Sequence, residues 1–208
     1  TRELARDHVL VRLLFINALS FGLLMAYLSA APFVLRNVLG MGTVAYTAVF
    51  GLCGATVTVT IAVAASLVRR FSQARQVRVG LIAGLVVDTV FAGVCLTWLR
   101  EPVTGPERMP LLVAVVALFL AHVACLGLSM GNAPALALDR TGRWAGTGSA
   151  LLGFLQFVIG GLVSPLVGLT GEASGAAFGV VIVAVGAVAN ILAVFGLRER
   201  GEKQRLGQ

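Results

Sequence analysis

Six apolar stretches, each long enough to cross a membrane, divide the chain. They cover residues 10–31, 46–68, 79–99, 111–138, 146–169 and 175–197. A helix rises about 1.5 Å per residue, so about 20 residues span a hydrocarbon core of about 30 Å. Polar sequence separates the last five stretches at residues 69–78, 100–110, 139–145 and 170–174. The pattern predicts an all-α membrane protein in which residues 1–208 form a single bundle of six transmembrane helices.

Composition supports this pattern and changes how the charge is interpreted. Hydrophobic residues make up 58% of the chain, charged residues 12%, and the mean hydropathy is +0.96. A soluble domain carries about 25% charged residues. The net charge of +7 is therefore interpreted as a topology signal, and the predicted partner is the lipid bilayer rather than nucleic acid. The three cysteines lie in apolar stretches and the two histidines lie far apart, so we predict neither a metal site nor a cofactor.

The basic residues fall mainly on one side of the predicted membrane. Thirteen of the 16 Lys and Arg residues lie at the two ends and in the second and fourth connections, and three lie on the other side. The thirteen are Arg2, Arg6, Arg12, Arg69, Arg70, Arg75, Arg78, Arg140, Arg143, Arg198, Arg200, Lys203 and Arg205, and the three are Arg36, Arg100 and Arg108. The positive-inside rule therefore predicts that both termini are cytoplasmic.

Small residues and one proline mark places for close helix packing. The fourth stretch is longer than a membrane requires, and Gly131 and Pro134 predict a kink or hinge within it. In the fifth stretch, small residues form two rows with a spacing of four, one up to Gly153 and one from Gly160, and this spacing lets helix backbones approach closely in lipid. The packing candidates in that stretch are Ser149, Gly153, Gly160, Ser164 and Gly168.

Asp88 and His122 are the two titratable side chains predicted near mid-membrane. Each lies one residue from the centre of its predicted membrane-length segment, and consecutive spans run antiparallel, so the two side chains can meet at one depth. An ionised Asp at the bilayer centre costs roughly 2.5–3.5 kcal/mol, so it requires a partner, a proton or water. Two interpretations stay open: a protonatable Asp88–His122 relay, or an Asp88 that is protonated or bonded to a hydroxyl such as that of Thr89 as structural support.

Other polar and aromatic side chains lie inside the apolar stretches. Asn17 and Gln156 lie near the middle of the first and fifth spans, where interhelical hydrogen bonding and cavity lining are both open. Asn190 favours an interhelical hydrogen bond. Phe21 and Tyr27 either line a cavity or serve packing.

The residue types of a hydrolase triad occur in this chain, but their arrangement excludes one. Ser149 lacks a G-x-S-x-G sequence and is predicted near the cytoplasmic end of its span, far from His122 near mid-membrane. No Walker A motif or dinucleotide-binding fingerprint is present. We therefore predict that the chain is not an enzyme.

Several segments resemble the second half of drug exporters of the major facilitator superfamily, most closely the Bcr/CflA drug-resistance subfamily. They are NAPALAL (132–138), AGTGSALLGFLQ (145–156) and SPLVGL (164–169), together with YLSAAPFVL (27–35), the Gly40–Gly42 turn, Phe50-Gly51 and the basic LVRRFSQARQVRVG (67–80). The sequence departs from the family pattern at Gly148, where Ala is expected, and at Asp88, which belongs to no motif of that family.

The resemblance implies the carboxy-terminal half, spans seven to twelve, of a proton-coupled multidrug antiporter in a bacterial inner membrane. Its partners would be the missing N-terminal six-span half, small amphipathic substrates and protons. Such halves are 3+3 inverted repeats with the substrate near the midplane. The first, second, fourth and fifth spans would face the central cavity, which supports Asn17, Tyr27, His122 and Gln156 as cavity residues. The third and sixth spans would be peripheral, which argues against Asp88 as a cavity residue. The family's coupling acids lie in the missing half.

One alternative stays open. A self-contained six-span channel subunit or membrane scaffold that forms a homo-oligomer would need no partner half, and the small-residue rows permit it. Because the chain begins at Thr1, we expect it to be a segment of a longer protein rather than a processed chain.

Overall fold

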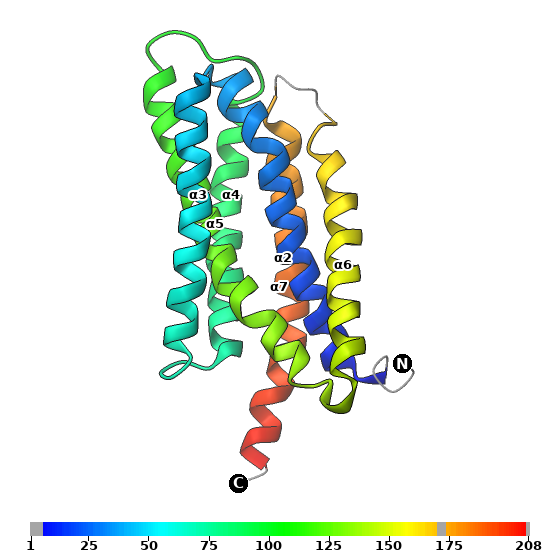
Figure 1. The fold of residues 1–208 in the computed structure, drawn as a ribbon. Helices are drawn as coiled ribbons and strands as arrows, with labels where there is room; N and C mark the ends of the chain where they lie inside the picture. The colour runs from blue at the N-terminus through cyan, green and yellow to red at the C-terminus, as the bar shows by residue number, and fades with distance from the viewer. Residues whose placement is uncertain (1–5, 170–173, 207–208) are drawn as a thin grey trace.

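The computed structural model describes residues 6–169 and 174–206, with side chains described as far as Phe195. Within these residues the chain is helical and contains no strand (Figure 1). The helices are α2 (His8–Pro32), α3 (Thr43–Leu67), α4 (Gln73–Trp98), α5 (Arg108–Leu138), α6 (Ala145–Leu166) and α7 (Ala176–Leu206), with a π-helix η1 (Phe33–Val38) and a 3-10 turn η2 (Gly142–Trp144). Six helical segments in this part of the chain are long and apolar enough to cross a membrane. The predicted fold class is confirmed.

The helices extend beyond the apolar stretches at several ends. α4 begins at Gln73 rather than at residue 79, because the Ser72 side chain caps its first turn by accepting a hydrogen bond from the Arg75 amide at 3.4 Å. α2 continues through η1 to a turn at Gly40, whose φ of +60° favours glycine. The hydropathy of a segment indicates which residues can lie in lipid. A helix can extend beyond that segment wherever its backbone groups still form hydrogen bonds. The predicted connection at residues 170–174 falls almost entirely outside the described residues.

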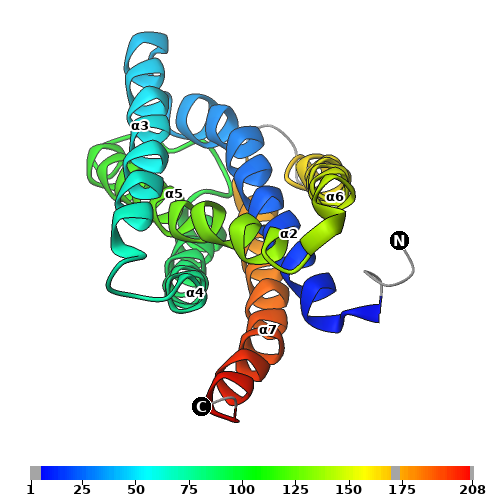
Figure 2. The ribbon, with the colours of Figure 1, turned by 60° about the horizontal axis from the view of Figure 1, so that its bottom comes forward.

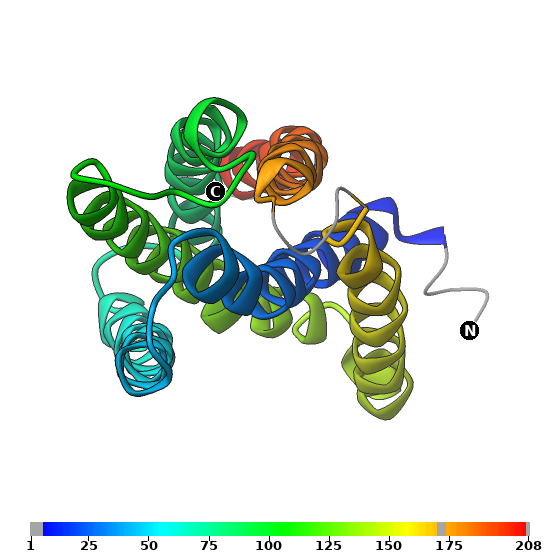
Figure 3. The same cartoon turned by 90° about the horizontal axis from the view of Figure 1, so that it is seen from above.

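The six helices run side by side, with α2 at the centre. The first turn of α2 and the last turn of α7 lie at the same end of the bundle, together with the α3–α4 and α5–α6 connections (Figure 1). Viewed from above, α4 and α7 lie on one side, while α3 and α6 lie at the two outer corners beside α5 and α2 (Figure 3). In the most apolar window of α2, 67% of residues are buried, against 11% in α3 and 17% in α6.

The packing partners repeat between the two halves of the bundle. α2 packs on α6 and α7, α5 packs on α3 and α4, and the pairs α2–α5 and α4–α7 complete the core. Exchanging α2, α3 and α4 for α5, α6 and α7 reproduces the same set of contacts. The turned view in Figure 2 shows α5 crossing next to α2, with α4 and α7 on one flank. This is the pairing expected of a 3+3 repeat.

Small residues make several of these contacts close. A Cβ added at Gly80 of α4 would lie 2.8 Å from Leu128 Cβ of α5, and one added at Gly127 of α5 would lie 2.7 Å from Thr60 Cβ of α3. Helix backbones therefore approach closely at both positions.

The predicted packing residues of α6 divide into two groups. A Cβ at Gly160 would lie 2.8 Å from Met25 Cγ of α2, and the Ser164 hydroxyl bonds the Ser29 hydroxyl at 2.6 Å. By contrast, Ser149 is exposed, Gly153 has open space where a Cβ would be, and Gly168 faces only its own Pro165 carbonyl. In α5, a Cβ added at Gly131 would lie 3.5 Å from Ile61 Cγ2 of α3, which is ordinary contact. The helix is continuous through Pro134, and its lower part leans towards α6 in Figure 1. The hinge role of Gly131 and Pro134 stays a prediction.

An ion pair joins the start of α2 to the end of α5. The Asp7 carboxylate caps α2 by accepting hydrogen bonds from the Val9 and Leu10 amides, and its Oδ2 lies 2.8 Å from a guanidinium nitrogen of Arg140. Partial burial raises the pKa of Asp7, but the Leu10 amide and Arg140 together hold that pKa below the usual aspartate value.

The sign of this pKa shift predicts a pH dependence. Because the folded pKa lies below the unfolded value of about 3.9, the stabilisation is present above that value and is lost as the pH falls through the folded pKa. We expect Asp7→Asn, which keeps a capping side chain, to lower the free energy of unfolding by about 0.2–1 kcal/mol at neutral pH. The difference should vanish in acid, as measured by thermal unfolding in detergent. Asp139→Asn, which removes an exposed carboxyl at the end of α5, is the matched control for the loss of one charge.

Candidate functional site

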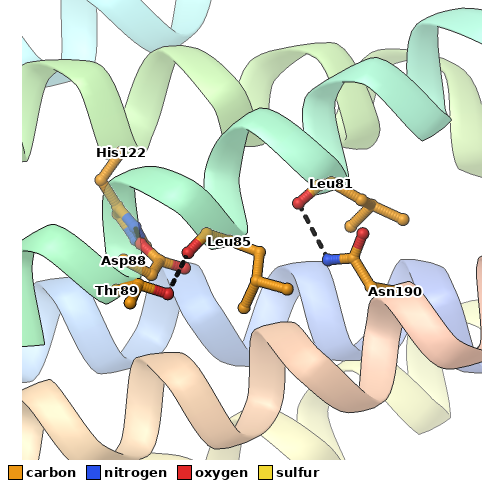
Figure 4. Close-up of polar contacts among 6 residues, drawn as sticks. All are labelled: Leu81, Leu85, Asp88, Thr89, His122 and Asn190. Atoms are coloured by element: carbon orange, nitrogen blue, oxygen red, sulfur yellow. Dashed lines mark hydrogen bonds and ion pairs between the residues drawn. The ribbon is translucent and has the colours of Figure 1, made fainter.

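Asp88 and His122 meet inside the bundle. Asp88 comes from α4 and His122 from α5, and the Nδ1 atom of His122 lies 2.5 Å from Oδ1 of Asp88. The two side chains have relative exposures of only 1% and 2%. Figure 4 shows the imidazole ring reaching down from α5 to the carboxylate on α4. The structure therefore brings together the two titratable residues that the sequence placed at one depth.

Small residues on α4 allow this contact. Gly80, Gly84 and Asp88 are spaced four residues apart and share one helix face. A Cβ at Gly80 would come within 2.9 Å of the Cys125 carbonyl oxygen, and one at Gly84 would lie 3.4 Å from Cys125 Cβ. Because α5 approaches so closely on this face, the short Asp88 side chain reaches the imidazole ring.

Helix α7 closes the other side of the pair. A Cβ at Gly186 would lie 3.3 Å from Oδ2 of Asp88, so that carboxylate oxygen faces the α7 backbone. One turn further along α7, the Asn190 amide nitrogen donates to the Leu81 carbonyl of α4 at 2.9 Å (Figure 4). It also donates to the Gly186 carbonyl of its own helix at 2.9 Å. Asn190 thus makes the expected interhelical bond and fixes α7 against α4 beside the pair.

Thr89 is not the partner of Asp88. Its hydroxyl donates to the Leu85 carbonyl of its own helix at 2.7 Å, and the residue is exposed (Figure 4). Of the two interpretations open at the sequence level, the geometry favours the Asp88–His122 contact over a hydroxyl bond to Thr89.

Two polar atoms beside the pair lack a partner. Nε2 of His122 and the Ser129 hydroxyl are buried and make no hydrogen bond within the described part of the chain. A small cavity of about 10 Å³, measured by the space open to the centre of a water molecule, adjoins both residues. That space holds about one water. The cavity is lined by Leu23, Gly80, Leu81, Gly84, Leu85, Asp88, His122, Cys125, Leu126, Ser129 and Gly186.

The chemistry available to this site is proton binding. A carboxylate and an imidazole in direct contact can share one proton and take up a second, and histidine changes charge near neutral pH in ordinary surroundings. Metal binding has no comparable support: among the described residues, no three His, Cys, Asp or Glu side chains gather closely enough to hold an ion.

The remaining predicted site residues do not join this pair in one site. Asn17 is buried on α2, and neither atom of its amide finds a partner among the described residues. Tyr27 is also buried and packs against Phe50 and Phe119, with ring centroids 6.0 and 5.3 Å apart. Both side chains thus lie within this bundle rather than on an open face.

Phe21 and Gln156 lie at the α2–α6 side and are half-buried. The Phe21 ring contacts the ring of Phe157 on α6, with centroids 5.6 Å apart. In sequence, Gln156 lies between Phe154 and Phe157, which are 65% and 74% exposed. The cavity role of all these residues stays a prediction.

A second buried polar contact joins α4 and α5 nearer the α3–α4 connection. The Asn132 amide nitrogen lies 3.3 Å from Gln76 Oε1, and Gln76 in turn donates to the Phe71 carbonyl. Gln76 escaped the sequence analysis because it lies in the basic segment 69–78, which was assigned to a polar connection. The Ser72 capping position before Gln73 was the available signal that this segment begins a helix.

Comparison with known proteins gives one informative similarity. The chain is 29% identical over 187 residues to YdgK of Bacillus subtilis (strain 168), which is described as an uncharacterized MFS-type transporter. The match covers 88% of this chain and 41% of that protein, so the chain spans about two fifths of the length of the relative. No family model and no solved structure matches the chain. With the six-helix bundle and its repeated packing, this similarity supports the major facilitator superfamily.

Proposed function

We propose that this chain is the carboxy-terminal six-span half of a major facilitator transporter that exports amphipathic compounds in exchange for protons. In this proposal both termini are cytoplasmic and the membrane is a bacterial inner membrane. The similarity to an MFS-type transporter supports transport. The resemblance of residues 27–35, 67–80 and 131–169 to Bcr/CflA exporters supports drug efflux as the activity.

The position of α3 and α6 is the main structural support for the proposal. These two helices occupy the outer corners beside α5 and α2 (Figure 3), and they are the least buried of the six. A transporter of this kind rocks two bundles against each other around a site between them. A second bundle placed against the α3, α2–α5 and α6 side would cover both weakly buried helices and enclose a central cavity.

Weakly specific apolar contacts would hold the substrate, with few polar anchors. Gln156, Phe154 and Phe157 suit this role because α6 presents them near its middle, where Phe154 and Phe157 are exposed on this chain alone. Phe21 of α2 adds a ring beside that of Phe157. Substrates that are flat and amphipathic fit rings of this kind better than small polar solutes do.

A substitution at Gln156 tests this surface. We expect Gln156→Ala to change which compounds are exported, because it removes a polar anchor while leaving the apolar contacts and membrane insertion intact. The measurement is growth inhibition by a panel of amphipathic dyes and antibiotics in a strain that lacks its own exporters. Ser149→Ala on the same helix, exposed and near its end, is the matched control. Unchanged resistance to every compound would exclude this role for Gln156.

The genomic context tests the proposal as a whole. We expect the coding sequence upstream of Thr1 to encode six further apolar spans in the same frame, and the complete gene product to confer dye resistance that collapses when the proton gradient is dissipated. A start codon directly before Thr1, together with a stable homo-oligomer in detergent, would instead favour the self-contained six-span channel or scaffold.

A further inference from the structure

We propose that Asp88 and His122 form a proton-binding site within this half of the transporter, and that the site loads and releases a proton during the transport cycle. This inference rests on the proposed proton-coupled transport. It adds a named site in a half of the molecule where the resemblance to drug exporters places no coupling residue.

The residue pair is unusual for structural support alone. Asp88 is the single acidic residue within the six apolar stretches of the sequence, and it contacts the single histidine found there. Intramembrane acids are expensive and mark proton or ion pathways. The Ser29–Ser164 hydroxyls and the Asn190 amide link helices within the bundle as uncharged groups, whereas the charged Asp7–Arg140 link lies at its partly exposed end. These uncharged groups link helices without a burial penalty for charge.

The geometry specifies where the proton binds. With the imidazole neutral and Nδ1–H donating to Oδ1 of Asp88, the free lone pair lies on Nε2, which has no partner among the described residues. A proton delivered by water in the adjoining cavity would add to Nε2 and give an imidazolium beside a carboxylate. The proton arrives on a hydronium ion, whose O–H bond breaks as the Nε2–H bond forms; the hydronium becomes water, and no other bond changes.

Charge balance couples this step to access from water. The unprotonated pair carries one buried negative charge, whereas the protonated pair is neutral overall. In a closed, dry bundle the neutral form is favoured, and opening the site to water permits release. A conformational cycle that alternately exposes the pair to the two sides would therefore carry one proton across.

The surroundings contribute little competing charge. On α5 the cavity includes Cys125, a titratable thiol, and Ser129; α4 contributes Leu85 and glycines, α2 contributes Leu23, and α7 contributes Gly186. Cys125 is thus the one other titratable group among the described lining residues. Because Oδ2 of Asp88 faces Gly186 and Asn190 holds α7 to α4 one turn away, movement of α7 is the structural change best placed to admit water.

Nitrogen NMR of histidine in the complete gene product, held in lipid nanodiscs, tests the site directly. The His122 signal is identified by its loss in His122→Gln. Spectra recorded from about pH 5 to about pH 8 separate its imidazole form from its imidazolium form. We expect the imidazolium share of the His122 signal to be smaller in Asp88→Asn than in the wild type at the same pH, because the stabilising carboxylate is gone. Thr89→Val, next in sequence and exposed, should match the wild type. A His122 signal that is neutral imidazole throughout this range in the wild type, or one that is unaffected by Asp88→Asn, would overturn the inference.

Vesicles loaded with ethidium as the probe test the role in coupling. We expect Asp88→Asn and His122→Gln to lose ethidium movement driven by a proton gradient while retaining exchange of ethidium without a gradient, and Thr89→Val to retain both. Full gradient-driven movement in the two pair variants would overturn the coupling role. If the wild type moves no ethidium, the result counts against the proposed efflux function, and the histidine titration alone decides whether the pair binds a proton.

Discussion

Substituting Asp88 by Ala should destabilise the bundle by about 3–5 kcal/mol, the range found when one member of a buried charged pair is removed. The substitution leaves His122 at 1% exposure with no partner for either ring nitrogen among the described residues. It also leaves a gap at the place where α4, α5 and α7 meet. Replacing both residues in Asp88→Leu/His122→Leu should recover most of the loss, because no unpartnered polar group then remains in the apolar interior.

The two buried thiols provide the measurement. Cys53 and Cys95 are 1% and 0% exposed, so their reaction with a thiol dye during heating reports loss of the fold. Thr89→Ala is the matched control and should change the unfolding temperature little, since its hydroxyl bonds only its own helix. Equal effects of Asp88→Ala and Thr89→Ala, or a double variant as unstable as Asp88→Ala, would show that the pair adds no net stability.

The sequence predicted the bundle and the depth of its central pair for physical reasons that the structure makes plain. Long uncharged stretches must be helical in lipid, because every backbone group has to bond within its own segment. Antiparallel neighbours then place residues equally far from their span centres at one depth, which is why contact between Asp88 and His122 was one of the two interpretations left open.

Direction around each helix axis was harder to predict. Nearly every face of these helices is apolar, so the pattern that identifies the core side of a soluble helix is weak here. The sequence did not show, for example, that Asn17 and Tyr27 are buried within this bundle, and their cavity role stays a prediction. The peripheral position of its span disfavoured Asp88 as a cavity residue. Its side chain nevertheless points inward, between α5 and α7. Position in the bundle and direction of a side chain are separate properties, and hydropathy along the chain reports neither.

The close approach of α4 and α5 leads to the second large effect, at Gly80. A Cβ there would lie 2.8 Å from Leu128 Cβ and 2.9 Å from the Cys125 carbonyl oxygen, and a backbone atom cannot move aside as a flexible side chain can. We expect Gly80→Val to destabilise the bundle by at least about 1–3 kcal/mol, the usual range for overpacking.

Gly93→Val is the matched control, because Gly93 lies on the same helix with nothing within 4 Å of an added Cβ. The control also removes the shared effect of exchanging Gly for a β-branched residue in a helix. Thiol reactivity of Cys53 and Cys95 on heating again gives the unfolding temperature. If Gly80→Val and Gly93→Val unfold at the same temperature, α4 and α5 are not held as closely as described, and the short contact between Asp88 and His122 loses the packing that makes it possible.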